Sequence, residues 1–217
     1  MRLILSRHGN TFAPGEPAYW VGSKDDLPLV ESGKAQARAL AAALKEADLP
    51  LEAVFAAPLQ RTLGYARLLA DEGVLQPPKV DERLMELDYG LWSGLTNEQV
   101  AASFAQEPLD AWAQRSVWPA EGRWGESEAE VVERVRSFAS QVSQEYPLGN
   151  VLAISSNGLM RYFLALVPGA WEKAAEDHAF KVATGNLSIL EYCSGSWQVI
   201  HWNQKPQAAF FSRAHIS

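Results

Sequence analysis

Short apolar runs alternate along the chain with longer segments in which apolar residues recur every three or four positions. The runs at residues 3–5, 53–56 and 151–154 predict buried strands, because each is too short for a helix and is bounded by polar or turn-forming residues. Residues 188–192 and 197–202 resemble a closing pair of strands. The pattern therefore predicts five strands.

Helices are predicted in the segments between these strands. Ser32 can cap a helix that runs to about Ala47, and Pro58 suits the first turn of the next helix. The clearest helix starts at Ser127, and a further one is expected at residues 158–166. The helix after Ser127 has apolar residues spaced by four, three and four positions: Val131, Val135, Phe138 and Val142.

The alternation of strands and helices predicts an α/β fold, a three-layer α/β/α sandwich with a mostly parallel central sheet. Residues 97–125 have weaker periodicity and are expected to form a small helical cap within a single domain that spans residues 1–217. The cap contains Trp112, Trp118 and Trp124. We expect these tryptophans to pack the cap on the body, and the alternative is that one or more of them line a pocket.

Composition narrows the classes of partner. The formal net charge of -7 predicts a surface that repels nucleic acid and anionic membranes, so we expect neither as a partner. No segment approaches the ~20 apolar residues that span a bilayer, and the first apolar run is too short for a signal peptide, so we expect a cytoplasmic protein. The sequence leaves both a monomer and a homodimer open. The single cysteine, Cys193, lies in an apolar run and is expected to be a buried thiol.

Candidate chemistry begins directly after the first predicted strand, at Arg7-His8-Gly9. Ligands of open α/β sheets bind at the carboxyl ends of the strands. An imidazole can attack phosphorus and form a covalent intermediate, and an adjacent guanidinium can hold phosphate oxygens. The alternative interpretation is a surface histidine beside a charge-balancing arginine, and the triplet alone does not decide between the two.

Two more charged residues occupy unusual positions. Arg61 falls in the first turn of a predicted helix, where a cation is unfavourable unless an anion lies there too. Glu86 lies between apolar neighbours, and partial burial would suit its carboxyl group for proton transfer. The alternative for Glu86 is an ordinary carboxylate at the end of a strand.

In their order along the chain, these motifs resemble the blocks of the histidine phosphatase superfamily, the phosphoglycerate-mutase-like proteins. Chance does not readily produce so many matches in one order. The matching blocks are Arg7 to Thr11, Asp26 to Leu29 with Gly33 and Gln36, Pro58 to Arg61, Leu84 to Thr96, Trp124 to Ser127 with Arg134, Thr184 to Asn186, and Trp202-Asn203.

The resemblance implies a role for each matched residue. His8 would attack phosphorus and become phosphohistidine, while Arg7 and Arg61 neutralise the phosphoryl oxygens and Asn10 helps to bind them. Glu86 would protonate the leaving oxygen and then activate water. No metal or other cofactor is implied, because the guanidinium groups supply the positive charge. The implied substrate is a small phosphorylated metabolite.

The chain departs from the family at a second pocket histidine, which usually follows a late strand. In the matching run, which ends at Arg161, Ser156 takes that position and Asn157 lies beside it. Neither side chain can carry a positive charge. We expect both to line the phosphate pocket as neutral donors, with backbone N–H groups at the start of the following helix facing the phosphate.

Three functions remain open at this point. The preferred one is a metal-independent phosphatase that hydrolyses small phosphate monoesters, because no long extra cap segment of the kind found in mutases is evident between Gly94 and Ser127. The second is a phosphoglycerate-type mutase. The third is a weakly active or inactive member that binds a phosphorylated ligand, which the loss of the second histidine favours.

Overall fold

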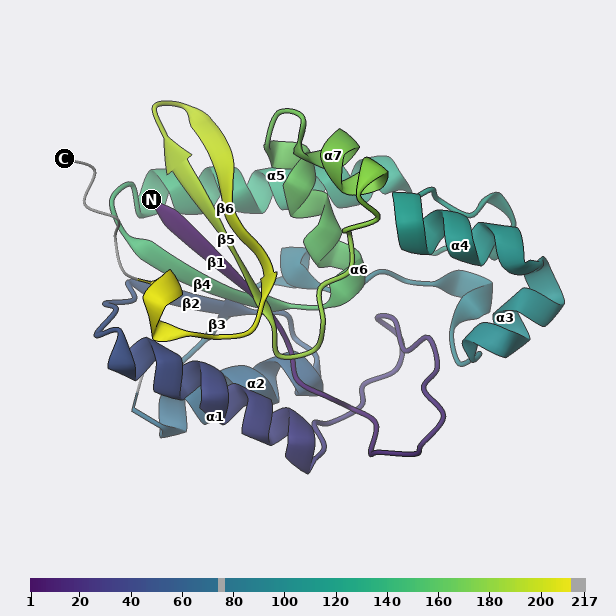
Figure 1. Cartoon of the computed structure of the whole chain (residues 1–217), viewed down its shortest axis with the longest axis horizontal. Coiled ribbons are helices and arrows are strands. Elements are labelled where there is room, and N and C mark those ends of the chain that lie inside the picture. Colours follow the sequence, from purple (N-terminus) through teal and green to yellow (C-terminus); the bar gives the residue numbers. More distant parts are fainter. Residues whose placement is uncertain (74–76, 212–217) are drawn as a thin grey trace.

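A mixed sheet forms the centre of the computed structural model, which describes residues 1–73 and 77–211 (Figure 1). Its spatial order is β3-β2-β4-β1-β5-β6, in which β3, β2, β4 and β1 run parallel, while β5 is antiparallel to both β1 and β6. The strands are β1 (Arg2–Arg7), β2 (Ala53–Ala56), β3 (Lys79–Val80), β4 (Asn150–Ser155), β5 (Leu187–Cys193) and β6 (Ser196–Gln204).

Helices cover both faces of this sheet, as the sequence predicted. Ile4 and Leu152 pack with residues of α1 and α2, whereas Leu3 and Val151 pack with residues of α5, so neighbouring strand residues enter opposite cores. Because both faces are covered, the central strands are apolar without interruption. The helices are α1 (Glu31–Glu46), α2 (Gln60–Asp71), α3 (Asn97–Phe104), α4 (Gln106–Arg115), α5 (Glu128–Glu145), α6 (Asn157–Met160) and α7 (Ala170–Glu176).

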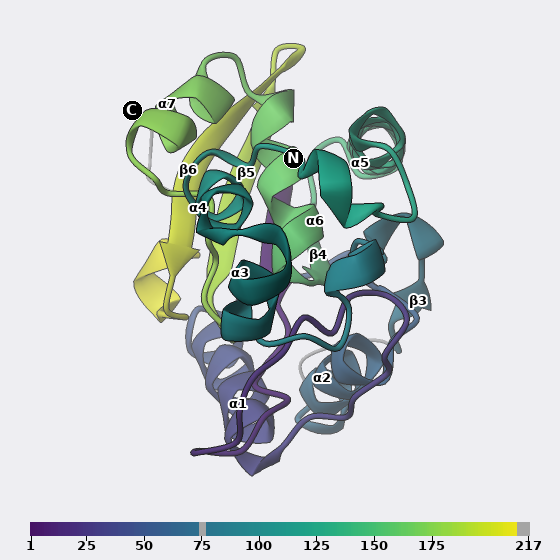
Figure 2. The same cartoon turned by 90° about the vertical axis from the view of Figure 1, so that its right-hand side faces the viewer.

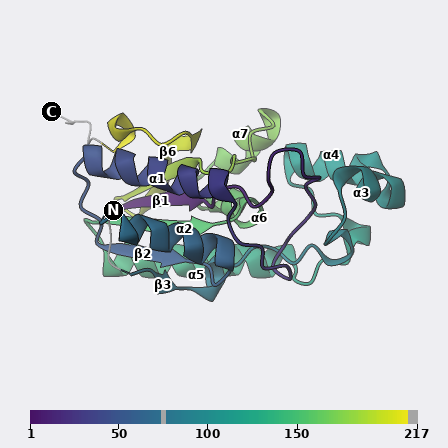
Figure 3. The ribbon, with the colours of Figure 1, turned by 90° about the horizontal axis from the view of Figure 1, so that it is seen from below.

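The helices α3 and α4 stand beyond the end of the sheet, at the right of Figure 1 and of Figure 3. Figure 2 views this end directly and shows both helices in front of the sheet. The cap tryptophans Trp112 and Trp124 are 1% and 8% exposed, and Trp118 is half-buried. Their rings stack edge to face, with centroids 4.6 Å apart in both the Trp112–Trp124 and the Trp118–Trp124 pair. The tryptophans therefore pack the cap on the body, as expected, and Trp112 also lines a cavity, as the alternative interpretation held.

The starts of two helices differ from the prediction. Ser32 lies inside α1, whose N-cap is Val30, and the Ser32 hydroxyl accepts a hydrogen bond from the Asn10 amide instead. Pro58 lies before α2 rather than in its first turn. The Asp26 carboxylate, 34 residues away in sequence, accepts the Gln60 N–H at 2.6 Å and so caps α2.

The predicted helix at 158–166 is divided: α6 ends at Met160, and a 3-10 helix continues from Arg161 to Leu166. Cys193 was expected to be buried and is exposed. It ends β5, past Glu191, the last β5 residue paired with β1, so it pairs only with Ser196 of β6 and has no strand on its other side. In the described part of the chain, no helix is long and apolar enough to cross a membrane.

Candidate active site

A cavity of about 950 Å³ lies beyond the carboxyl ends of β1 and β4, between the sheet and the cap helices. It brings together residues that are far apart in the sequence, from Arg7 to Thr184. Of the predicted site residues, those that line it are Arg7, His8, Asn10, Arg61, Glu86 and Asn157. No group of three or more His, Cys, Asp or Glu side chains that could hold a metal ion occurs among the described residues.

His8 follows β1 and is held in a single orientation. Its backbone N–H donates to the Ser155 carbonyl, and its Nδ1 lies 2.7 Å from the Gly9 carbonyl oxygen. A carbonyl oxygen only accepts, so Nδ1 carries the proton and Nε2 keeps its lone pair. Burial lowers the pKa of the His8 ring well below its ordinary value, and the charges of Arg7 and Arg61 lower it further. The ring is therefore neutral at neutral pH, as a nucleophile must be.

Arg7 and Arg61 are anchored by backbone carbonyls rather than by carboxylates. Arg7 Nη1 donates to the Val182 carbonyl at 2.6 Å, and Arg61 donates to the carbonyls of Gly22 and Asp25 at 2.7 and 2.9 Å. Burial lowers the pKa of both arginines, although the charge of Glu86 partly offsets this shift. Neither forms an ion pair within the described residues. Their charge is thus free to bind an anion.

Glu86 is 6% exposed, and backbone N–H groups hold its carboxyl group. Oε1 accepts from Leu87 and Leu159 at 3.0 Å, and Oε2 accepts from Gly158 at 3.1 Å. This corrects the expectation that the first N–H groups of α6 face the phosphate, because two of them bind Glu86. A Cβ at Gly158 would collide with Glu86 and with the Tyr89 hydroxyl, so glycine is required for this approach.

The two residues that replace the second histidine lie in different places. Asn157 lines the cavity, and its Oδ1 accepts the Val182 N–H at 2.8 Å, which leaves its Nδ2 free to donate. Ser156 is 1% exposed and does not line the cavity. Within the described part of the chain its Oγ has no hydrogen-bond partner. A role of Ser156 in phosphate binding stays a prediction.

Sequence reasoning assigned no role to two residues that belong to this site. Arg161, 2% exposed, lines the cavity and stacks on Trp112, with its guanidinium carbon 3.8 Å from the ring centroid. Tyr89 hydrogen-bonds to Glu86, and burial raises the pKa of its phenol well above the ordinary value, so it keeps its proton. Both lie in stretches of sequence that match the family, and that match was the only signal in the sequence that could have indicated them.

The family model of the histidine phosphatase superfamily (branch 1) matches residues 3–205. The chain belongs to the histidine phosphatase superfamily. It is 28% identical over 187 residues to phosphoserine phosphatase 1 of Hydrogenobacter thermophilus, covering 84% of this chain and 85% of the relative. It is 34% identical over 179 residues to glucosyl-3-phosphoglycerate phosphatase of Mycolicibacterium vanbaalenii, covering 77% and 74%.

The solved structures agree with this membership. The native structure of a mycobacterial glucosyl-3-phosphoglycerate phosphatase superposes with a TM-score of 0.76 at 26% identity, covering 94% of this chain and 99% of that one. This similarity extends over the sheet, the covering helices and the cap segment of the chain. The two relatives named above are phosphatases, in agreement with a phosphoric monoester hydrolase of the histidine phosphatase type, and the chain is also 26% identical over 182 residues to 2,3-bisphosphoglycerate-dependent phosphoglycerate mutase of Bifidobacterium longum, covering 72% of each chain.

Proposed function

We propose that the chain hydrolyses small phosphate monoesters through a phosphohistidine intermediate at His8, without a metal ion. The observation that carries this proposal is the state of His8. Its neutral ring presents Nε2 in a cavity that also contains Arg7 and Arg61, which no carboxylate neutralises by an ion pair among the described residues. A phosphoryl group is the anion that such an arrangement can both bind and accept.

The proposed reaction has two steps. In the first, His8 Nε2 attacks phosphorus, the bond from phosphorus to the ester oxygen breaks, and Glu86 gives a proton to the departing alcohol. In the second, Glu86 takes a proton from water, the water oxygen attacks phosphorus, and the bond to Nε2 breaks to release inorganic phosphate. Arg7 and Arg61 neutralise the phosphoryl oxygens in both steps.

The rest of the cavity favours hydrolysis over a mutase reaction. A phosphoglycerate-type mutase must also hold the carboxylate or second phosphate of its substrate, outside the phosphoryl site at His8. Away from His8, the described lining residues with ionisable charges near the cap are Lys181, Arg161, Glu98 and Asp110, whose charges sum to zero, so this region offers no net positive charge to a second anionic group. Aromatic side chains of Tyr19 and Trp20 form part of the remaining wall. This region suits an organic leaving group better than a second phosphate.

A rapid-quench experiment with a radiolabelled phosphate ester tests the proposal. We expect an acid-labile, base-stable phosphoenzyme in the wild type, with turnover unaffected by EDTA. His8→Ala should abolish both the phosphoenzyme and turnover. His178→Ala, at an exposed histidine outside the cavity, is the control and should retain both. Wild-type turnover in His8→Ala would show that the mechanism is wrong.

A further inference from the structure

The segment that carries Glu86 has no regular secondary structure of its own. Residues 85–89 lie between two short 3-10 helices, Glu82–Leu84 and Gly90–Trp92. The regular backbone hydrogen bonds of a strand or helix therefore do not fix the backbone next to the proposed acid/base group. A proton-transfer group must stay within hydrogen-bond reach of the reacting oxygen. Backbone N–H groups of Ser23 and Gly125 bind the Leu87 and Asp88 carbonyls that follow Glu86, so the carbonyls that precede Glu86 are the ones that other groups must hold.

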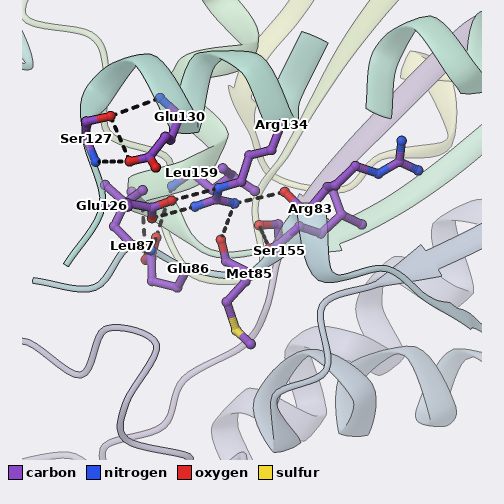
Figure 4. Close-up of polar contacts among 12 residues, drawn as sticks. Arg83, Met85, Glu86, Leu87, Glu126, Ser127, Glu130, Arg134, Ser155 and Leu159 are labelled. Carbon is purple, nitrogen blue, oxygen red and sulfur yellow. Dashed lines mark hydrogen bonds and ion pairs between the residues drawn. The ribbon is translucent and has the colours of Figure 1, made fainter. Parts of the chain in front are cut away.

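Side chains from two other elements supply the missing hydrogen bonds (Figure 4). Arg134 of α5 donates from Nη1 to the carbonyls of Arg83 and Met85, at 2.9 and 2.7 Å. Ser155, the last residue of β4, donates from Oγ to the Leu84 carbonyl at 2.7 Å. Three consecutive carbonyls that lead to Glu86 are thus bound by side chains.

Glu126 fixes the direction of the Arg134 guanidinium. Its carboxylate accepts from Arg134 Nε at 3.1 Å and from Nη2 at 2.8 Å, a two-point contact between planar groups. The side chains of Arg134 and Glu126 are only 16% and 23% exposed, so water screens the pair weakly. With Nε and Nη2 held by Glu126, Nη1 is left to bind the two carbonyls.

The geometry points to a positioning role. The Met85 carbonyl and the Glu86 N–H belong to one planar peptide unit, so a hydrogen bond to that carbonyl also orients the backbone of Glu86. We propose that the Arg134–Glu126 pair positions Glu86 for proton transfer without touching the substrate. This inference rests on the proposed role of Glu86 and extends it to residues outside the cavity.

Arg134→Met removes the donors while keeping a side chain of similar length. Because misplacement of a reacting group by about 1 Å can cost on the order of 100-fold, we expect kcat on an alkyl phosphate to fall about 10- to 100-fold. The fall should be much smaller on p-nitrophenyl phosphate, whose leaving group needs little protonation, and KM should change little. Arg134→Lys should recover part of the loss. Arg136→Met, at an exposed position of the same helix, is the control.

Glu86→Gln, measured in parallel, separates this inference from the proposed function. In the Glu86→Gln background, Arg134→Met should cause no further loss, because the group that it positions is already gone. Equal losses on both substrates, or an additive loss in that background, would overturn the positioning role. Should Arg134→Met fail to fold, Glu126→Gln is measured in its place. We expect a smaller loss of kcat that is again larger on the alkyl phosphate than on p-nitrophenyl phosphate. Unchanged kcat on the alkyl phosphate would count against the positioning role.

These outcomes assign a failure to one proposal or the other. A leaving-group-dependent loss in Glu86→Gln together with normal kcat in Arg134→Met would overturn only the positioning role. Full activity of Glu86→Gln on the alkyl phosphate would overturn the proposed acid/base function of Glu86, and the positioning role with it.

Discussion

Two residues of the proposed phosphate site are connected through the backbone of Val182. Its N–H donates to Asn157 Oδ1, and its carbonyl accepts from Arg7 Nη1. Asn157 therefore holds the loop that in turn holds one of the two arginines beside His8. At the scale of the single residue, Asn157, which lies next to the replaced histidine, binds the Val182 backbone with its amide oxygen and still has its amide N–H₂ group for a ligand.

Asn157→Asp tests whether this side chain lies beside the bound phosphate. The carboxylate keeps an acceptor for the Val182 N–H but replaces the free donor with negative charge. We expect inorganic phosphate to bind about 10-fold more weakly or worse, because like charges at short range repel. The measurement is the competitive inhibition constant of inorganic phosphate.

Asn97→Asp is a matched control, because Asn97 also lines the cavity and its Oδ1 also accepts an N–H, from Trp20 at 3.0 Å. It lies on the cap rather than beside His8, so its effect on phosphate binding should be small. Equal weakening in the two variants would contradict the placement of phosphate next to Asn157.

At the scale of the element, α5 begins with a capping box that its own sequence encodes. Ser127 Oγ accepts the Glu130 N–H at 3.3 Å, and Glu130 Oε2 accepts the Ser127 N–H at 2.7 Å. By contrast, α1 and α2 have no side-chain cap from their own N-cap residues. The start of α5 could therefore be predicted to the residue, whereas the starts of α1 and α2 could not.

Ser127→Ala removes the cap and should lower the free energy of unfolding by about 1 kcal/mol. Urea denaturation followed by circular dichroism measures the change. Ser143→Ala lies within the same helix, where its hydroxyl only donates back to the Ser140 carbonyl, so that variant should change stability little. If both variants lost the same stability, the capping box would not be the cause of the loss.

At the scale of the whole molecule, an aromatic cluster joins the cap to the body. The Trp124 ring contacts the rings of Tyr89 and Trp92 from the segment around Glu86, with centroids 4.9 and 5.5 Å apart. It also contacts Trp112 and Trp118 of the cap. One residue thus packs at once against the cap and against the segment that carries the proposed acid/base group.

Trp124→Ala should lower the free energy of unfolding by about 3–5 kcal/mol, since it removes a buried ring and leaves a cavity. Trp118→Ala removes a half-buried ring from the edge of the same cluster and should cost less. Both values come from chemical denaturation. A loss for Trp124→Ala no larger than that for Trp118→Ala would show that Trp124 is not the centre of the junction.

The sequence by itself determined the five longer strands, the layered architecture and the identity of the proposed nucleophile, whereas the two-residue edge strand β3, whose residues are exposed, was not predicted. Strand runs such as residues 53–56 are short and apolar because both faces of the sheet are covered, and that pattern is visible without coordinates. Motif order likewise indicated His8, Arg7, Arg61 and Glu86, which the structure places around one cavity. These features depend on residue type and on spacing along the chain, which the sequence contains in full.

Only the tertiary structure decided which partner each polar group takes. The first N–H groups of α6 bind Glu86, and Asp26 caps the N-terminus of α2. Each of these carboxylates is far away in sequence from the helix that it binds. Cys193 is exposed because β5 extends past its pairing with β1. Arg134 reaches carbonyls about 50 positions earlier in the chain. Hydrogen bonds and burial depend on distances in space, and a local pattern of residues does not specify which distant groups will meet.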